Sequence, residues 1–208
     1  PLYAVVDQQT ATRHGWTVPD LARTYLAGGA RLIQVRVTDG GSAQFLAWCD
    51  KIVADARSYG AQVIVNNRAD IAVLSGAAGV HVGQQDLGVA AVRTLMPEPA
   101  IVGLSTHTAS ELERSVDAPV SYVAVGPAYA TATKDTGYAP VGLDLVRHAI
   151  RLRHARPVVA IGGITLERAP EVLGAGATSV AVVADLLTGG DPERRVRDYV
   201  SALAPSTK

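Results

Sequence analysis

One loop in the second half of the chain combines the residue types that hold a phosphorylated ligand. An apolar, β-branched run at residues 122–125 stops at the Gly-Pro pair 126–127, and the loop that follows carries Thr131, Thr133 and Lys134. Glycine lets the backbone approach a ligand, proline fixes the turn, and the lysine ammonium adds charge beside two hydroxyls. The pattern predicts a phosphate-binding loop, although an ordinary surface loop with a solvated lysine also fits it.

Two further polar clusters lie at the ends of apolar runs. The run at residues 32–36 contains Gln34 and Arg36, and strand alternation places both on the same side of the chain. An arginine at a strand end can grip phosphate through two hydrogen bonds, or it can pair with a carboxylate inside the protein. Asn66 and Asn67 end the next run and offer amide groups to a polar heterocycle or a hydrated metal; an Asx cap for the following helix is the alternative.

The loops after the fourth and fifth apolar runs supply a carboxylate, a hydroxyl and an imidazole. Asp86 is placed as an oxygen ligand for Mg²⁺, which takes one or two carboxylates and completes its shell with waters and substrate phosphates. A helix cap is the alternative role for Asp86. Ser105 can donate to a diphosphate, and His107 can titrate near neutral pH as an acid or base. His81 lies inside an apolar run and is predicted to be a hydrogen-bonded core histidine.

A glycine pair follows the seventh apolar run. Backbone N–H groups at Gly162 and Gly163, together with those at Val183 and Ala184 after the eighth run, form the pattern of a phosphate cup. Simple turn chemistry is the alternative. The sequence thus predicts two phosphate-binding regions, one at this cup and one among the polar loops above. With Asp86 added, the site suits a diphosphate with Mg²⁺ beside a second, monophosphorylated substrate.

The fold must bring these loops together. The apolar runs are short and continuous rather than alternating, which is typical of parallel strands buried on both faces. Eight such runs alternate with eight helical patterns, at about 26 residues per unit, and predict an α/β fold, a single-domain (β/α)8 TIM barrel over residues 1–208. A doubly wound open sheet is the alternative. The predicted strands are residues 2–6, 32–36, 62–66, 79–82, 101–104, 122–125, 158–161 and 179–183. The predicted helices are residues 19–27, 42–58, 70–74, 89–95, 109–116, 143–153, 166–173 and 192–203, with candidate N-caps at Thr17, Ser42, Thr108, Thr165 and Asp191.

The composition limits the class of partner. The 19 basic and 19 acidic residues leave no net charge, which argues against nucleic-acid binding. Cys49 is the single cysteine, so no disulfide framework and no thiolate metal cluster is expected. The sequence has no signal-peptide pattern and no apolar run of about 18 residues, so we expect a soluble, cytoplasmic protein that does not enter a membrane.

Seven segments follow the order of a known family: Q-V-R (34–36), N-N-R-A-D-I-A (66–72), G-V-H-V-G-Q-Q-D-L (79–87), G-L-S-T-H-T (103–108), Y-V-A-V-G-P-A-Y-A-T-A-T-K (122–134), V-V-A-I-G-G-I (158–164) and the strand at 180–186. They cover nearly the whole chain and resemble the thiamine phosphate synthase family and its TenI-type relatives. The resemblance implies a (β/α)8 barrel that forms a homodimer. It also implies a transferase that joins hydroxymethylpyrimidine diphosphate to thiazole phosphate and releases pyrophosphate with the help of Mg²⁺.

The resemblance implies a role for each matching residue. Gln34 and Arg36 would line the diphosphate and pyrimidine side, with Asn66 beside the diphosphate. Asp86 would ligate Mg²⁺, and Ser105 would contact the pyrimidine or the diphosphate. Thr131, Thr133 and Lys134 would close over the substrates, and Lys134 would also stabilise the leaving diphosphate. Gly163 and the backbone of Val183 and Ala184 would hold the thiazole phosphate.

Two positions depart from the synthase pattern. The family has Gln-x-Arg-x-Lys, and Thr38 stands at the lysine position; the family has Asn-Asp, and Asn67 stands at the aspartate position. The site therefore loses one cation and one anion, so we expect weaker binding of both Mg²⁺ and diphosphate. TenI-type thiazole tautomerases need no metal and use a histidine in the position of His107, which makes a tautomerase the alternative function. A non-catalytic binder of thiamine precursors is a third possibility.

Overall fold

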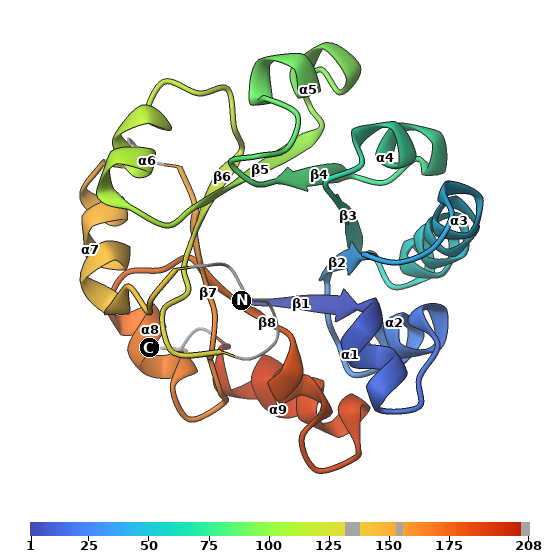
Figure 1. Cartoon of the computed structure of the whole chain (residues 1–208). Coiled ribbons are helices and arrows are strands. Elements are labelled where there is room, and N and C mark those ends of the chain that lie inside the picture. The colour runs from blue at the N-terminus through green and yellow to red at the C-terminus, as the bar shows by residue number, and fades with distance from the viewer. Residues whose placement is uncertain (132–137, 153–155, 205–208) are drawn as a thin grey trace.

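Eight parallel strands close into a barrel, in which each strand pairs with the next and the last pairs with the first (Figure 1). The computed structural model describes residues 1–131, 138–152 and 156–204. The closed barrel confirms the predicted (β/α)8 fold and excludes the open sheet. The strands are β1 (Leu2–Asp7), β2 (Leu32–Arg36), β3 (Gln62–Asn66), β4 (Gly79–Val82), β5 (Ile101–Thr106), β6 (Tyr122–Val125), β7 (Val158–Ile161) and β8 (Ser179–Val182).

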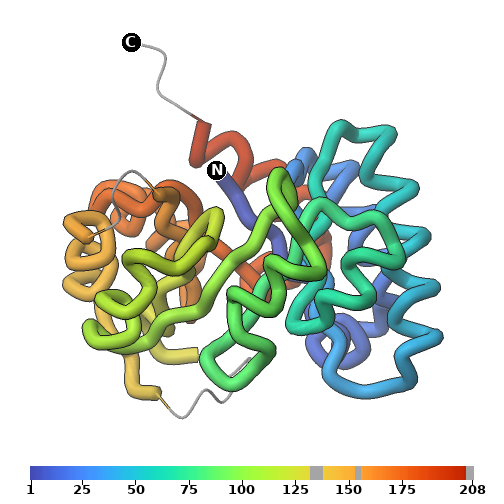
Figure 2. The backbone as a smooth tube through the Cα atoms, turned by 90° about the horizontal axis from the view of Figure 1, so that it is seen from above, coloured from blue at the N-terminus to red at the C-terminus, as the bar shows by residue number. Residues whose placement is uncertain are grey.

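Helices surround the barrel, with α2 to α4 on one flank and α6 to α8 on the opposite flank (Figures 1 and 2). Among the described residues, no helix has the length and hydropathy needed to cross a membrane. The helices are α1 (Gln8–Arg13), α2 (Val18–Ala27), α3 (Ser42–Ser58), α4 (Ala69–Ser75), α5 (Val89–Leu95), α6 (Ala109–Arg114), α7 (Gly142–Leu152), α8 (Ala169–Gly174), the 3-10 helix η1 (Ala184–Leu187) and α9 (Pro192–Ala202).

Three of the predicted N-caps are confirmed by side-chain hydrogen bonds. Thr17, Thr108 and Asp191 each accept the backbone N–H three residues further on, which satisfies a donor that the helix leaves unpaired. Ser42 is the first residue of α3 rather than its cap. Thr165 is not a cap either, because its carbonyl closes a turn and α8 starts only at Ala169.

The strands separate two apolar regions. Side chains that point outward pack under the helices and form the larger core, whereas a smaller cluster fills the barrel itself. The inner cluster combines small residues with two tyrosines, Tyr3 and Tyr122. Phenol groups need hydrogen-bond partners when buried, so the barrel interior carries polar contacts directly beneath its open end.

Candidate active site

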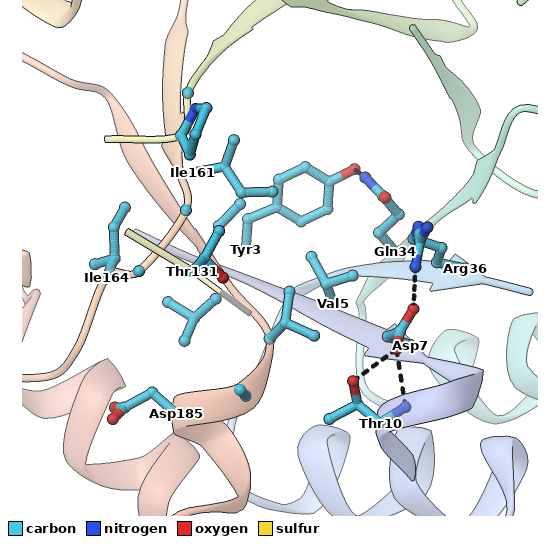
Figure 3. Close-up of a pocket in the computed structure, with 18 of the residues that line it drawn as sticks. Tyr3, Val5, Asp7, Thr10, Gln34, Arg36, Thr131, Ile161, Ile164 and Asp185 are labelled. Atoms are coloured by element: carbon cyan, nitrogen blue, oxygen red, sulfur yellow. Dashed lines mark hydrogen bonds and ion pairs between the residues drawn. The ribbon is translucent and has the colours of Figure 1, made fainter. Parts of the chain in front are cut away.

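A cavity of about 480 Å³ opens at the carboxyl ends of the strands, and all eight strands contribute side chains to its lining (Figure 3). This is the end of a (β/α)8 barrel where active sites lie. Most of the predicted site residues line it: Gln34, Arg36, Asn66, Ser105, His107, Thr131, Gly162, Gly163, Val183 and Ala184. Four other predicted site residues are not among the residues that line this cavity. Asn67 lines a neighbouring cavity, Asp86 lies outside the lining of both, and Thr133 and Lys134 lie outside the described residues.

The neighbouring cavity, of about 370 Å³, shares Arg36 and Asn66 with the first. Thr38 and Asn67, the two positions that depart from the synthase pattern, both line it. Asn67 adopts a left-handed φ of 64° and donates its N–H to the His81 carbonyl. Asparagine tolerates this conformation better than most residues. The predicted alternative of an Asx cap is not observed, because α4 begins without a side-chain cap.

Arg36 forms an ion pair with Asp7 across the adjoining ends of β1 and β2 (Figure 3). The Asp7 side chain is 1% exposed, and its other oxygen accepts the backbone N–H and the hydroxyl of Thr10 at 2.9 and 2.6 Å. Asp7 therefore caps α1 and orients the guanidinium at the same time. The interpretation that Arg36 pairs with a carboxylate inside the protein is confirmed, and the arginine also lines the cavity.

His107 projects from the loop after β5 into the cavity. Its Nδ1 contacts the Gly126 carbonyl, and its ring stacks on Tyr138 with 4.4 Å between centroids. A carbonyl only accepts, so Nδ1 carries the hydrogen, and the neutral imidazole has its lone pair on Nε2. The His107 backbone N–H donates to Glu111 at 2.6 Å, which anchors the loop to α6. In its neutral form this imidazole can act as a base through Nε2.

Glycine is required at both positions of the pair after β7, because of the backbone conformation and the atoms that lie close to it. Gly162 and Gly163 have φ values of 99° and 62°, which favour glycine. A Cβ on Gly162 would lie 2.5 Å from the Pro127 Cβ, and one on Gly163 would lie 2.4 Å from the Ala130 carbonyl oxygen. The turn is thus pressed against the loop after β6, and both loops line the cavity.

Asp185 holds together the elements on the other side of this turn. It is the second residue of η1 and accepts hydrogen bonds from the Tyr199 hydroxyl at 2.6 Å, Arg195 at 2.7 Å and the Leu166 N–H at 3.2 Å. Burial and the Asp185 carboxylate raise the pKa of Tyr199, so the phenol remains a donor. One carboxylate therefore joins the loop after β7, η1 and α9.

Replacing Asp185 with alanine is expected to lower the free energy of unfolding by about 2–4 kcal/mol, because three donors lose a largely buried partner. Urea unfolding measures this change. Asp185→Asn is the matched control and should lose about half as much, since its amide oxygen still accepts. An alanine variant as stable as the parent would show that the three hydrogen bonds do not hold these elements together.

Several residues that line the cavity were not among the predicted site residues. His81 is one of them, although its burial and its hydrogen bonds to Tyr122 and Ser105 confirm the predicted hydrogen-bonded core histidine. Tyr3, Asp7 and His81 lie in strands, where side chains of the core are expected, whereas Arg13 and His14 belong to the short helix α1 and its end. The α1 segment, Q-Q-T-A-T-R, has no apolar period that could reveal it. A clue was available for Asp7, which is an acidic residue directly after an apolar run.

The described residues contain no group of three or more His, Cys, Asp or Glu side chains that could hold a metal. Asp86 accepts the Gly83 N–H at 2.7 Å and closes the turn after β4. It does not cap α5, whose N-cap is Gly88. Mg²⁺ takes one or two protein carboxylates and completes its shell with waters and substrate phosphates, and Asp86 is a carboxylate of the kind this requires.

The barrel and its cavity define this chain as a (β/α)8 barrel protein whose site is built at the carboxyl ends of the strands. Comparison with known proteins adds the family. The family model described as thiamine monophosphate synthase matches residues 2–186, and the chain belongs to this family.

Individual relatives agree with this assignment. The chain is 38% identical over 204 residues to a thiamine-phosphate synthase of Koribacter versatilis, covering 97% of this chain and 95% of that protein. It is 37% identical over 205 residues to a thiamine-phosphate synthase of Methanospirillum hungatei, covering 99% and 98%. A solved thiamine phosphate pyrophosphorylase from Pyrococcus furiosus superimposes with a TM-score of 0.87 at 25% identity, covering 97% of this chain and 94% of that one.

Proposed function

We propose that this chain is a thiamine-phosphate synthase that joins hydroxymethylpyrimidine diphosphate to thiazole phosphate. The observation that carries the proposal is that one cavity is lined by Arg36, Ser105 and the glycine pair 162–163. A diphosphate and a monophosphate require two anion-binding regions close together, and this cavity contains candidates for both. The names of the relatives support the same reaction.

The chemistry proposed for the site is dissociative. The bond between the pyrimidine methylene and the diphosphate breaks, the thiazole nitrogen attacks the methylene cation, and pyrophosphate leaves. Arg36 and Lys134 would neutralise charge on the leaving group, while the backbone around Gly163 and Ala184 holds the thiazole phosphate. Catalysis then depends on positioning and electrostatics, with no protein nucleophile.

We propose that Mg²⁺ binds through Asp86 and the diphosphate oxygens. When bound, it would supply positive charge beside the leaving group. Asn67 stands where a second carboxylate is expected from the family, so the substrate has to provide more of the ligands. This arrangement predicts that the ion binds weakly to the protein alone and more tightly with the diphosphate.

The metal proposal is tested by assaying thiamine phosphate formation from both pure substrates. We expect EDTA to stop product formation and added Mg²⁺ to restore it. Asp86→Ala should lower kcat/KM by about 10- to 100-fold, because charge stabilisation at the leaving group is lost. Asp144→Ala on the exposed face of α7 is the control and should leave the rate unchanged. Product formation that EDTA does not affect, or no product at all, would contradict the proposal.

A thiazole tautomerase is the second candidate, and the geometry of His107 favours it. Because Nδ1 contacts the Gly126 carbonyl, Nε2 is available to move a proton on a bound thiazole carboxylate phosphate. The same assay series includes this metal-free reaction with His107→Asn. A full tautomerase rate in that variant would reject the role of His107. Affinity for phosphorylated ligands without turnover in either reaction would indicate a binding protein.

We also propose that the chain forms a homodimer, as the family resemblance implies. Sedimentation equilibrium measures this directly. A monomeric mass at micromolar concentration would contradict it.

A further inference from the structure

A chain of four hydrogen bonds crosses the floor of the cavity and links two residues proposed to contact the pyrimidine substrate. Gln34 Nε2 donates to the Tyr3 hydroxyl at 2.9 Å, and this hydroxyl lies 3.0 Å from that of Tyr122. The Tyr122 hydroxyl lies 2.9 Å from His81 Nδ1, and His81 Nε2 lies 2.8 Å from Ser105 Oγ. The five side chains come from five strands, and Figure 3 shows the first link.

With His81 neutral, the donor at the Gln34 end favours one direction for the later links. An amide nitrogen only donates, so the Tyr3 oxygen accepts from Gln34. The hydrogen of this buried hydroxyl needs an acceptor, and Tyr122 is the one neighbour in this series that can take it, so we assign Tyr3 as the donor to Tyr122. Tyr122 then donates to His81 Nδ1. A neutral imidazole that accepts at Nδ1 carries its hydrogen on Nε2, and this hydrogen is donated to Ser105 Oγ. The Ser105 oxygen is already an acceptor, so its own hydrogen is directed away from the chain.

Burial keeps the two phenols in the form that this direction requires. Tyr3 and Tyr122 are 1% and 6% exposed, and burial raises the pKa of both hydroxyls. Both groups therefore stay protonated and can donate. Because Tyr122 is not among the residues that line the cavity, its influence on a ligand has to pass through its hydrogen-bond partners Tyr3 and His81, and His81 is the partner that contacts Ser105.

A glycine on β5 provides an independent observation. A Cβ on Gly103 would lie 2.1 Å from Tyr122 Cζ, 2.3 Å from its hydroxyl oxygen and 2.6 Å from His81 Nδ1. These distances are far below van der Waals contact. A glycine inside a strand commonly marks a close approach of another group. Here the approaching groups are the Tyr122 hydroxyl and the His81 ring, at the place where they are hydrogen-bonded to each other.

We propose that Tyr122 is a positioning residue that acts through His81 to make Ser105 a hydrogen-bond donor to the substrate, so that the site selects a pyrimidine whose ring nitrogen accepts a hydrogen bond. The inference rests on the proposed function. The ring nitrogen of an aminopyrimidine has a lone pair for the Ser105 hydroxyl. The corresponding oxopyrimidine carries N–H at that nitrogen, so the Ser105 oxygen has to accept it on its second lone pair and turn its own hydrogen away, which leaves that hydrogen without its acceptor.

Calorimetric binding of the two pyrimidine diphosphates, without the thiazole substrate, tests this selection. The parent protein is expected to prefer the amino compound by at least about 10-fold, the cost of an unsatisfied buried donor. Tyr122→Phe should reduce the preference to within about threefold, because His81 can then accept from Ser105 instead. In steady-state assays the same variant should raise KM for the amino compound while kcat changes little.

Three further variants separate positioning from structural support. Tyr25→Phe removes another fully buried phenol, one that takes no part in this series of hydrogen bonds. This variant should keep the full preference for the amino compound. Ser105→Ala should abolish the preference, and adding Tyr122→Phe to it should cause no further loss of preference. Gly103→Ala should reproduce the effect of Tyr122→Phe from the other side of the same hydrogen bond.

The results distinguish this inference from the proposed function. A folded Tyr122→Phe or Gly103→Ala protein that keeps the preference, or that weakens both ligands equally, would overturn the inference while leaving the proposed function intact. Failure of the parent protein to bind either pyrimidine diphosphate would overturn the proposed function and this inference with it.

Discussion

Replacing Arg36 with glutamine is expected to lower kcat/KM by about 100- to 1,000-fold and to destabilise the barrel. The guanidinium lines both cavities and supplies positive charge at the proposed diphosphate end, so its loss removes charge stabilisation there. It is also the ion-pair partner of the buried Asp7. An uncompensated buried charge costs about 3–5 kcal/mol, and the Thr10 hydrogen bonds to Asp7 offset part of that cost. Steady-state kinetics and urea unfolding measure the two effects.

A double variant separates stability from activity. Asp7→Asn combined with Arg36→Gln leaves no unpaired buried charge, so most of the lost stability should return while the activity should not. Arg23→Gln is the control, because its ion pairs are at the surface and contribute at most about 1 kcal/mol. Unchanged kcat/KM in Arg36→Gln would reject the proposed role of this arginine. Unchanged stability would reject the structural role of the ion pair.

Gly163→Ala is expected to raise KM for thiazole phosphate by about 100-fold or more and to lower the unfolding free energy by about 2–4 kcal/mol. Alanine is strained at a φ of 62°, and its Cβ would meet the Ala130 carbonyl oxygen at 2.4 Å. That oxygen belongs to the backbone, so the loop that carries Thr131 has to move. Because the proposed diphosphate region lies on other strands, affinity for hydroxymethylpyrimidine diphosphate should change much less.

Gly174→Ala is the matched control for this substitution. Gly174 is the last residue of α8, its φ is ordinary, and a Cβ there would meet no atom within 4 Å. It should leave both affinities unchanged and leave stability equal or slightly higher, because alanine loses less backbone entropy on folding. If Gly163→Ala instead bound both substrates like the parent, the backbone at 162–163 would not be the phosphate cup.

The strands could be located from the sequence almost residue by residue. β2, β3, β4, β6 and β7 have the predicted bounds, because a parallel strand buried on both faces needs a continuous apolar run that ends sharply. β8 ends one residue earlier than predicted, at Val182, whereas β1 and β5 extend further, by one and two residues. Their last residues are polar, and hydrophobicity alone does not show that the pairing of Asp7 with Arg36 and of Thr106 with Val125 continues.

The helices were less predictable where local pattern is weak. The six-residue α1 has no apolar stripe, and its cap comes from Asp7 at the end of a strand. A helix was predicted at residues 166–173, but α8 begins three residues later, at Ala169. The reason is that the Asp185 carboxylate accepts the Leu166 N–H and the Thr165 carbonyl closes a turn. In both cases a contact outside the segment's own pattern decides where the helix begins.

By itself, the sequence determined the barrel, the position of polar residues after its strands and the resemblance to one family, because these depend on local pattern and on order along the chain. Only the tertiary structure decided that Arg36 pairs with Asp7, and that Gln34 and Ser105 are the two ends of one hydrogen-bonded chain through Tyr122. The physical reason is distance along the chain. Tyr3 and Tyr122 are 119 residues apart, and no periodicity in the sequence records which buried hydroxyl will meet which acceptor once the barrel closes.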